Sequence, residues 1–550
     1  MSLDEISDFA RVYSSSAASK SSQQVGSKDS LENLHSHGVE GHVELAGAMP
    51  QHFNEFNYSD DLYLDVVSPP FQSCQDEIMK IVGIQTKNAE LMEPKESKKS
   101  HAFASESFEA LRKYRSSRLK MDDKSSSTTH ASAPSLSTEA TIRFGAEKFI
   151  QSMSCSSNGL NLSSQSLLED SKEVRLIQNL LSSAHKVAQK QHEQAFEFLK
   201  ECGKMSSCAG TPIQRLVFYF SEALFLKIAT ETGRTQPKDS EKKPVDHLES
   251  ATLLNMDLMI AFHKKHPLAQ MTKLVGVQAV LDHLQEARKV HVIDLDIKSG
   301  VQWTILMQDL VARSENSRIQ RLKITAVGTK SKSLLENTGK HLESFAKSLN
   351  LEFSFRVVLV EDISDLHSNL FDLDHDESVA VYVSYALTNM IGNVDGLNHL
   401  MRVMQNMNPC VMVVAELEAN CNSPSFIGRF VESLFLFGAF FDSMADCFEG
   451  DETSRKNAES SWFRPSITNI LAAEGEERKI RHVSINVWRA FFARLGLVEI
   501  ELSSSSLDQA RLGMQSLTCG TSCTVYRDGK CLTLGWKGTP LCSLSAWKLP

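Results

Sequence analysis

Five short runs of β-forming, apolar residues alternate with helical segments between residues 290 and 441, and this alternation limits the fold most strongly. The runs are VHVIDLD, LKITAVG, FSFRVVLV, VAVYVSY and CVMVVAEL (Val290–Asp296, Leu322–Gly328, Phe353–Val360, Val379–Tyr385, Cys410–Leu417). Strands that are buried on both faces form continuous apolar runs, and a helix between them carries the chain back across the sheet. Because such crossovers are right-handed, the pattern predicts an α/β fold with a mostly parallel, doubly wound sheet.

The segments on either side of this region extend the prediction. Apolar residues recur at helical spacing from about residue 170, and Thr211–Ile228 begins with a Thr N-cap followed by Pro. With helices at Leu253–His263 and Thr272–Glu286, these residues predict an N-terminal helical cap. Near the end, Leu497–Ser503 and the pair CTVYRD and CLTLGWKG predict antiparallel edge strands.

Residues 1–165 are rich in Ser and contain no Trp, and we predict that they are largely disordered. Phe53–Val67 interleaves aromatic residues and leucines with acids, which is typical of an activation or docking motif and also fits a weakly structured patch. A basic cluster follows further along, a candidate nuclear import signal that also fits a solvated linker. Its members are Arg112, Lys113, Arg115, Arg118 and Lys120.

Composition narrows the class of protein. No run of 18 apolar residues occurs, and the first residues lack the apolar core of a secretory signal, so we expect neither a membrane span nor export. Eleven scattered cysteines favour reduced thiols in the cytosol or nucleus. A net charge of −10 argues against nucleic-acid binding by bulk electrostatics alone.

The first predicted strand ends VIDLDIKSGVQW, where an α/β sheet would bind a ligand. Asp294, Asp296 and Gln302 are weak cofactor-binding candidates, but Gly300 is the turn's single glycine and no acid follows the second strand. The spacing of the cysteines does not favour zinc, and the sequence contains no P-loop, G-x-S-x-G or H-E-x-x-H motif. We therefore expect no catalytic residue, no metal site and no cofactor.

Several motifs, in this order, resemble the GRAS family of plant transcriptional regulators. The run Val290, His291, Val292, Ile293, Asp294 is similar to the family's VHIID signature. Leu176–Leu199 and Ser333–Leu349 correspond to its leucine-rich regions, and Pro409 with VMVVAELEANCNSPSF resembles the start of its PFYRE region. Trp488, Gly496, Trp536 and Trp547 correspond to its SAW region. The aromatic pair and the Arg-Glu of PFYRE are not kept, and neither a DELLA nor a TVHYNP segment is found.

The resemblance implies a GRAS-like domain over residues 166–550. Its expected parts are the helical cap with the first leucine-rich region (166–288), the VHIID region (289–314), the second leucine-rich region (322–366), the PFYRE region (376–470) and the SAW region (474–550). It also implies a methyltransferase-like Rossmann core and a nuclear regulator of transcription that is not an enzyme. Expected partners are DNA-binding transcription factors, zinc-finger proteins among them, and other GRAS proteins in homo- or heterodimers.

Three functions remain open from the sequence. The first is a co-regulator that acts through protein contacts, the second a factor that binds promoter DNA directly, and the third a methyltransferase-like binder of a small ligand. Leu176, Leu180 and Val187 are candidates for a partner seam or for the interior of the cap. The three SAW tryptophans are expected to be structural anchors. Arg478 and Arg481 are expected on a surface face or at a phosphate contact.

Overall fold

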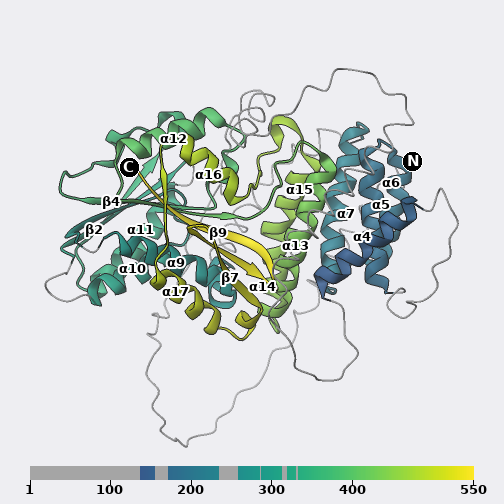
Figure 1. Ribbon diagram of the computed structural model, residues 1–550, viewed down its shortest axis with the longest axis horizontal. Helices are drawn as coiled ribbons and strands as arrows, with labels where there is room; N and C mark the ends of the chain where they lie inside the picture. Colours follow the sequence, from purple (N-terminus) through teal and green to yellow (C-terminus); the bar gives the residue numbers. More distant parts are fainter. Residues whose placement is uncertain (1–136, 155–170, 235–257, 285, 313–318, 330–331) are drawn as a thin grey trace, which may run out of the picture.

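The computed structural model describes residues 137–154, 171–234, 258–284, 286–312, 319–329 and 332–550. A helical cap forms one end of the molecule and a sheet with helices on both faces forms the other (Figure 1). The cap contains α4 (Thr138–Ser154), α5 (Lys172–Ala188), α6 (His192–Met205) and α7 (Pro212–Glu231). Thr211 caps α7 as predicted: its side chain accepts from the Gln214 backbone, and the Gln214 side chain accepts from the Thr211 backbone.

Nine strands of the described chain form one sheet in the order β3-β2-β1-β4-β5-β9-β8-β7, with β6 paired to β9. The parallel half consists of β1 (Lys289–Asp294), β2 (Arg321–Gly328), β3 (Phe353–Leu359), β4 (Ser378–Ser384) and β5 (Val411–Leu417). The antiparallel half consists of β6 (Val498–Ile500), β7 (Cys523–Asp528), β8 (Cys531–Trp536) and β9 (Thr539–Lys548). The predicted fold class is confirmed.

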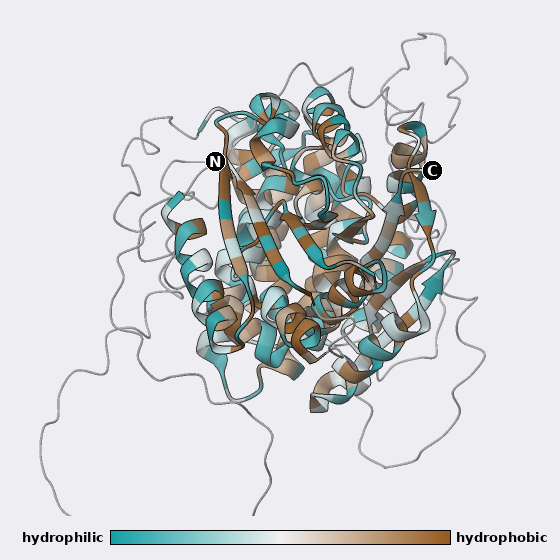
Figure 2. Ribbon diagram, turned by 90° about the vertical axis from the view of Figure 1, so that its left-hand side faces the viewer, coloured by the Kyte–Doolittle hydropathy of each residue, from teal (hydrophilic) through white to brown (hydrophobic). Residues whose placement is uncertain are grey.

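Helices cover both faces of this sheet (Figure 1), and apolar residues run along its central strands (Figure 2). The helices α9 (Pro267–Asp282), α10 (Val301–Ala312), α11 (Lys332–Ser348) and α17 (Ser504–Gln515) lie on one face. The helices α12 (Val394–Asn406) and α16 (Ile485–Arg494) lie on the other. Between cap and sheet lie α13 (Phe426–Cys447), α14 (Glu452–Ala458) and α15 (Arg464–Ala472). Phe220 of α7 packs against Phe430 and Phe437 of α13, so one hydrophobic core joins cap and sheet.

Two features differ from the sequence-based prediction. Helix α4 falls inside the stretch expected to be largely disordered; Ile142, Ala146 and Phe149 bury one of its faces in the core that it shares with α5 and α13. The longest strand, β9, was not predicted, because its sequence TPLCSLSAWK is poor in β-branched residues and puts Ser543 and Ser545 in the interior. Pairing with β5 and β8 satisfies its backbone and makes it a strand.

Helix α11 contacts β3 at Gly339, and we predict that Gly339→Ala destabilises the protein. A Cβ at this position would lie 2.2 Å from Phe355 Cδ1, so the helix would have to move away from the strand. Although Ala is the better helix former, overpacking of this kind costs about 1–3 kcal/mol. Urea unfolding measures the change, with Ser344→Ala on the exposed face of α11 as the matched control. Equal midpoints for the two variants would contradict the prediction.

Candidate functional site

The carboxyl end of β1 holds Asp294 in a buried hydrogen-bond network. Its carboxylate accepts from Trp303 Nε1 at 2.7 Å, from Gln302 Nε2 at 3.0 Å and from the Asp296 backbone N–H at 3.0 Å. Burial of the carboxyl group raises the pKa of Asp294 to about 7. Both side-chain donors belong to the first turn of α10, so the network anchors this helix to the strand and leaves Asp294 and Gln302 bonded to each other.

Asp294→Asn is expected to remove a pH dependence of stability. Because the pKa of Asp294 is raised in the folded state, unfolding releases a proton between about pH 4 and pH 7, and stability falls as the pH rises through this window. The slope reaches up to about 1.4 kcal/mol per pH unit for one proton. Urea unfolding at pH 5, 6, 7 and 8 gives the free energy of unfolding of wild type and variant. The contribution of the buried histidines is the same in both proteins and cancels in the difference. Parallel curves would show that Asp294 is ionised throughout.

The turn after β1 carries the next charged residues. Asp296 Oδ2 lies 2.9 Å from Lys298 Nζ, and this ammonium group lies over the Tyr385 ring at 5.6 Å from its centre. Lys298 and Tyr385 both have positive φ, 48° and 58°, which is uncommon for side chains other than Gly and Asn. Glu416 at the end of β5 accepts from the Leu387 backbone at 2.8 Å, and burial raises its pKa to about 8.

Gly300 in this turn faces protein and not a ligand. A Cβ there would lie 2.9 Å from Thr338 Cγ2 and 3.2 Å from Leu342 Cδ1, both on α11, and Thr338 Oγ1 donates to the Lys298 carbonyl at 2.9 Å. Gly300 therefore lets α11 pack closely against this turn. Asp294, Asp296 and Gln302 are brought together at the end of the first predicted strand, where they bond to one another.

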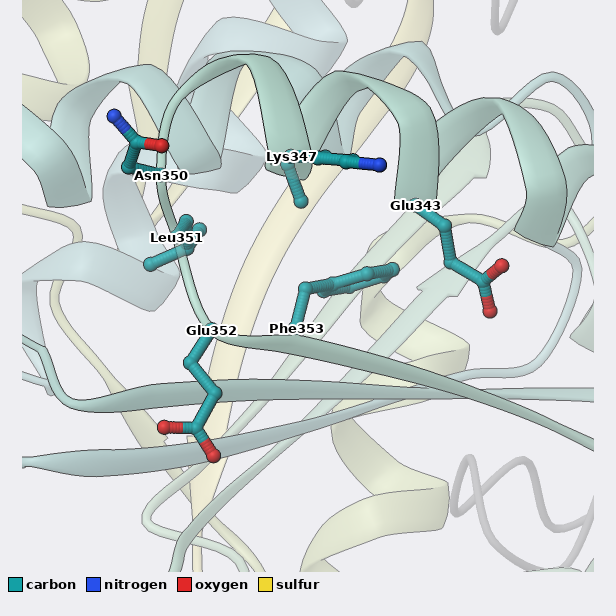
Figure 3. A pocket seen from close by; sticks show the side chains of 7 residues that line it. Glu343, Lys347, Asn350, Leu351, Glu352 and Phe353 are labelled. Carbon is teal, nitrogen blue, oxygen red and sulfur yellow. The ribbon is translucent and has the colours of Figure 1, made fainter.

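Two hollows in the described chain lie away from these strand ends. One, of about 350 Å³, lies between the end of α11 and the start of β3 and contains Lys347 and Phe353 (Figure 3). The other, of about 10 Å³, lies beneath α4 and is lined by Phe149, His185 and Phe430 among others. The described residues contain no group of three or more His, Cys, Asp or Glu side chains arranged to hold a metal ion.

His291 of the VHIID-like run connects three parts of the sheet region. Its Nε2 lies 2.7 Å from Thr325 Oγ1 on β2, and its Nδ1 lies 3.2 Å from Glu377 Oε2, just before β4. Lys323 Nζ reaches the same carboxylate at 3.3 Å. Burial lowers the pKa of His291 to about 3, so the imidazole is neutral. Val290, Val292 and Ile293 are buried beside it, and the whole run therefore has a structural role.

The leucine-rich candidates lie in the interior of the cap. Leu176, Leu180 and Val187 on α5 are buried in the core with residues of α6 and α7, so they leave no exposed stripe for a partner. Apolar residues recur at the same helical spacing on a face that packs in the core and on a face that binds a partner. Here the packing of the four cap helices shows that the face lies in the core. These three residues therefore belong to the interior of the cap and not to a partner surface.

The SAW residues lie on or near α16 and on the antiparallel strands β8 and β9. Trp488 on α16, Trp536 on β8 and Trp547 on β9 are all buried, and Gly496 adopts φ +78° just after the C-cap of α16. Phe492 links two of the tryptophans, because its ring lies 5.7 Å from that of Trp488 and 4.8 Å from that of Trp547.

Arg478 and Arg481 are not surface residues, contrary to the prediction. Arg478 Nη1 donates to the Cys421 carbonyl at 3.0 Å, while Arg481 donates to Asn422 Oδ1 and to the Gly475 carbonyl. Burial, with Arg429 and Arg481 nearby, lowers the pKa of Arg478 to about 9. The guanidinium groups fix the segment before α16 to the loop after β5, and are not exposed to phosphate.

Sequence reasoning missed a buried ion cluster. Glu459 Oε1 lies 2.9 Å from Arg215 Nε on α7 and 3.2 Å from Arg455 Nη1 on α14, and all three side chains are buried. Arg215 also donates to the carbonyls of Gly210 and Phe441. Since Arg215 and Glu459 are 244 positions apart, no local pattern signals this pair.

The molecule is a doubly wound α/β domain with a helical cap, and its own side chains bond to one another at the carboxyl end of β1. A model of the GRAS domain family matches residues 176–548, and the chain belongs to this family. Helix α4 lies before the matched residues. The basic cluster Arg112–Lys120 falls outside the described residues. Among the described residues, none of the helices combines the length and the apolar composition that a membrane span requires.

Relatives and a solved structure agree with this assignment. The DELLA protein GAI1 of Vitis vinifera is 30% identical over 389 residues, covering 70% of this chain and 63% of the relative. The DELLA protein GAI of Arabidopsis thaliana is also 30% identical, covering 70% of each chain. The crystal structure of SCL7 from Oryza sativa superposes with a TM-score of 0.60 at 25% identity, covering 68% of this chain and 99% of that one.

Proposed function

We propose that this protein is a nuclear regulator of transcription that reaches promoters mainly through DNA-binding partner proteins. Membership of the GRAS domain family over residues 176–548 is the observation that carries the proposal. Zinc-finger transcription factors and other GRAS proteins, in homo- or heterodimers, are the partners that the family resemblance implies. The protein acts by binding and not by catalysis.

The strand ends support a binding role. In α/β sheets of this type, ligands enter outside the carboxyl ends of the strands, at the switch point of strand order. Here Asp294 is bonded to Gln302 and Trp303, and Asp296 pairs with Lys298. A site filled in this way favours a scaffold that presents surfaces over an enzyme that holds a substrate.

Selection from a randomised DNA duplex library, at 50 mM and 200 mM salt, tests the partner-dependent route. The full-length chain by itself is expected to enrich no defined sequence, since its net charge of −10 supplies little phosphate attraction. The same chain, fused to a heterologous DNA-binding domain, is expected to change the output of a reporter in plant cells. Enrichment of one sequence that survives 200 mM salt would instead establish a factor that binds DNA directly.

A thermal shift assay with S-adenosylmethionine tests the alternative function, the binding of a small ligand. A ligand that binds only the folded state at 100 times its Kd adds about 2.7 kcal/mol to stability, which a thermal shift assay detects readily. We expect a change in Tm below about 1 °C, because Asp294 at this strand end is already bonded to Gln302 and Trp303. A rise of several degrees would favour the small-ligand function.

A further inference from the structure

We propose that the open edge of β3 is a docking site for an extended segment of a partner protein. The segment fits if it carries apolar side chains at alternate positions and a Lys or Arg among them. The inference rests on the proposed function, since it names one surface through which a partner is held.

The backbone of β3 presents unused hydrogen-bonding groups along this edge. Strand β3 ends the sheet order and pairs with β2 alone among the strands of the described residues. Leu322 N–H donates to the Glu352 carbonyl at 2.9 Å, and Val360 N–H donates to the Gly328 carbonyl at 3.1 Å. Peptide groups alternate along a strand, so those of residues 352, 354, 356, 358 and 360 face β2. The groups of Phe353, Phe355, Val357 and Leu359 therefore face outward.

This edge lacks the features with which proteins usually prevent strand addition, such as proline, bulges and rows of charge. Strand β3 is seven residues long and keeps an unbroken register with β2 from Phe353 to Leu359. Its one charged side chain, Arg356, is paired with Asp372 at 3.1 Å. Leu359 is 44% exposed at the end of the strand. An added strand would find free donors and acceptors beside apolar side chains.

The hollow between α11 and β3 gives the site its side-chain preference. Phe353, Phe355 and Val357 pack on the same core as Leu342 and Ala346 of α11. The hollow of about 350 Å³ lies at the start of the strand, and Figure 3 shows the Phe353 ring pointing toward α11, with Glu343 on the helix and Glu352 just before Phe353 in the chain.

A strand added beside β3 would direct every second side chain toward this face of the sheet, and the one level with Phe353 would reach the hollow. Two carboxylates, Glu343 and Glu352, line the hollow against the single ammonium group of Lys347. The surplus of negative charge favours Lys or Arg at that position of the bound segment.

The charge of the hollow also favours a segment of a partner protein over segments of this chain as the occupant of the site. In a second copy, the residues of β3 on the same face of the strand as Phe353 are Phe355, Val357 and Leu359, and none of the four supplies a basic group. The acidic-aromatic stretch Phe53–Val67 carries four carboxylates and no basic residue, so Glu343 and Glu352 would repel it. A basic, alternately apolar segment of another protein is the occupant that fits.

A phage-displayed library of eight-residue peptides, selected on the full-length protein, tests this site. We expect enrichment of alternating apolar residues with Lys or Arg. Val357→Pro removes an outward N–H and leaves the ladder to β2 intact, which is the one way in which Pro is tolerated in a sheet. It is expected to weaken binding of the enriched peptide, measured by fluorescence anisotropy, by at least tenfold. Val357→Thr keeps the N–H and should change the Kd less than threefold.

Two further measurements locate the peptide. The combined change Glu343→Lys and Glu352→Lys is expected to shift the selection from basic to acidic residues. Hydrogen exchange should slow at the outward amides of Phe353, Phe355, Val357 and Leu359 when peptide is bound. Amides that already face β2 should change little. Thermal unfolding of each variant confirms that the fold is retained.

Three results would overturn the proposal: no enriched pattern, equal binding by wild type and Val357→Pro, or a dimer that Val357→Pro converts to a monomer without any peptide binding. The last result would make β3 an interface between copies. The tethered reporter is read independently. If the wild-type chain binds the peptide but its fusion to a DNA-binding domain does not change reporter output, the proposed function is wrong and the docking site stands.

Discussion

Replacement of Glu459 by alanine is expected to lower the free energy of unfolding by about 3–5 kcal/mol, because it breaks a buried ion cluster from one side. Arg215 and Arg455 would remain in the interior without the carboxylate that both of them contact. Their charges would then repel each other where α7 meets α14, with water excluded. Urea unfolding of the full chain measures the loss.

A surface ion pair provides the control for Glu459. Arg511 and Asp508 lie 2.8 Å apart on α17, and both side chains are exposed. Exposed pairs contribute about 0–1 kcal/mol, so Arg511→Ala should be close to wild type. If Glu459→Ala is as stable as Arg511→Ala, the cluster has no net role. If the triple change Arg215→Met, Arg455→Met and Glu459→Met, which leaves no member of the cluster charged, recovers most of the loss, the damage came from the unpaired charges.

Trp547→Ala is the second substitution with a large expected effect, about 3–5 kcal/mol for the loss of a buried indole. Trp547 lies on β9 opposite Met412 of β5 and Glu499 of β6, where the parallel half of the sheet meets the antiparallel half. Its ring packs on Phe492, which in turn stacks on Trp488. The cavity left by alanine would therefore weaken the packing of α16 on the sheet.

Trp547→Phe keeps an aromatic ring in the core but loses part of the indole volume and the hydrogen bond from Nε1 to Ser545 Oγ, which is 2.9 Å long. Its cost should therefore be clearly smaller than that of alanine. Regulatory activity that falls in proportion to stability would identify Trp547 as a structural anchor. Activity that falls while both variants remain fully folded at the assay temperature would contradict this role and indicate a contact surface.

Much of the fold follows from local patterns. The five parallel strands lie within one or two residues of the predicted runs, because a strand buried on both faces must be apolar at nearly every position. The Thr-Pro start of α7 was equally readable, since the N-cap is defined by residues three positions apart. The β9 strand was not, because its pairing partners, and not its own residue types, make it a strand.

Candidate site residues divide in the same way. The sequence by itself determined that Asp294, Asp296 and Gln302 meet at one strand end, since register and chain order put them there. Only the tertiary structure decided that α11 packs against the neighbouring turn, that Arg478 and Arg481 are buried, and that three leucine-rich candidates lie inside the cap: Leu176, Leu180 and Val187. The physical reason is range: periodicity records which face of an element is apolar, whereas what covers that face depends on residues hundreds of positions away.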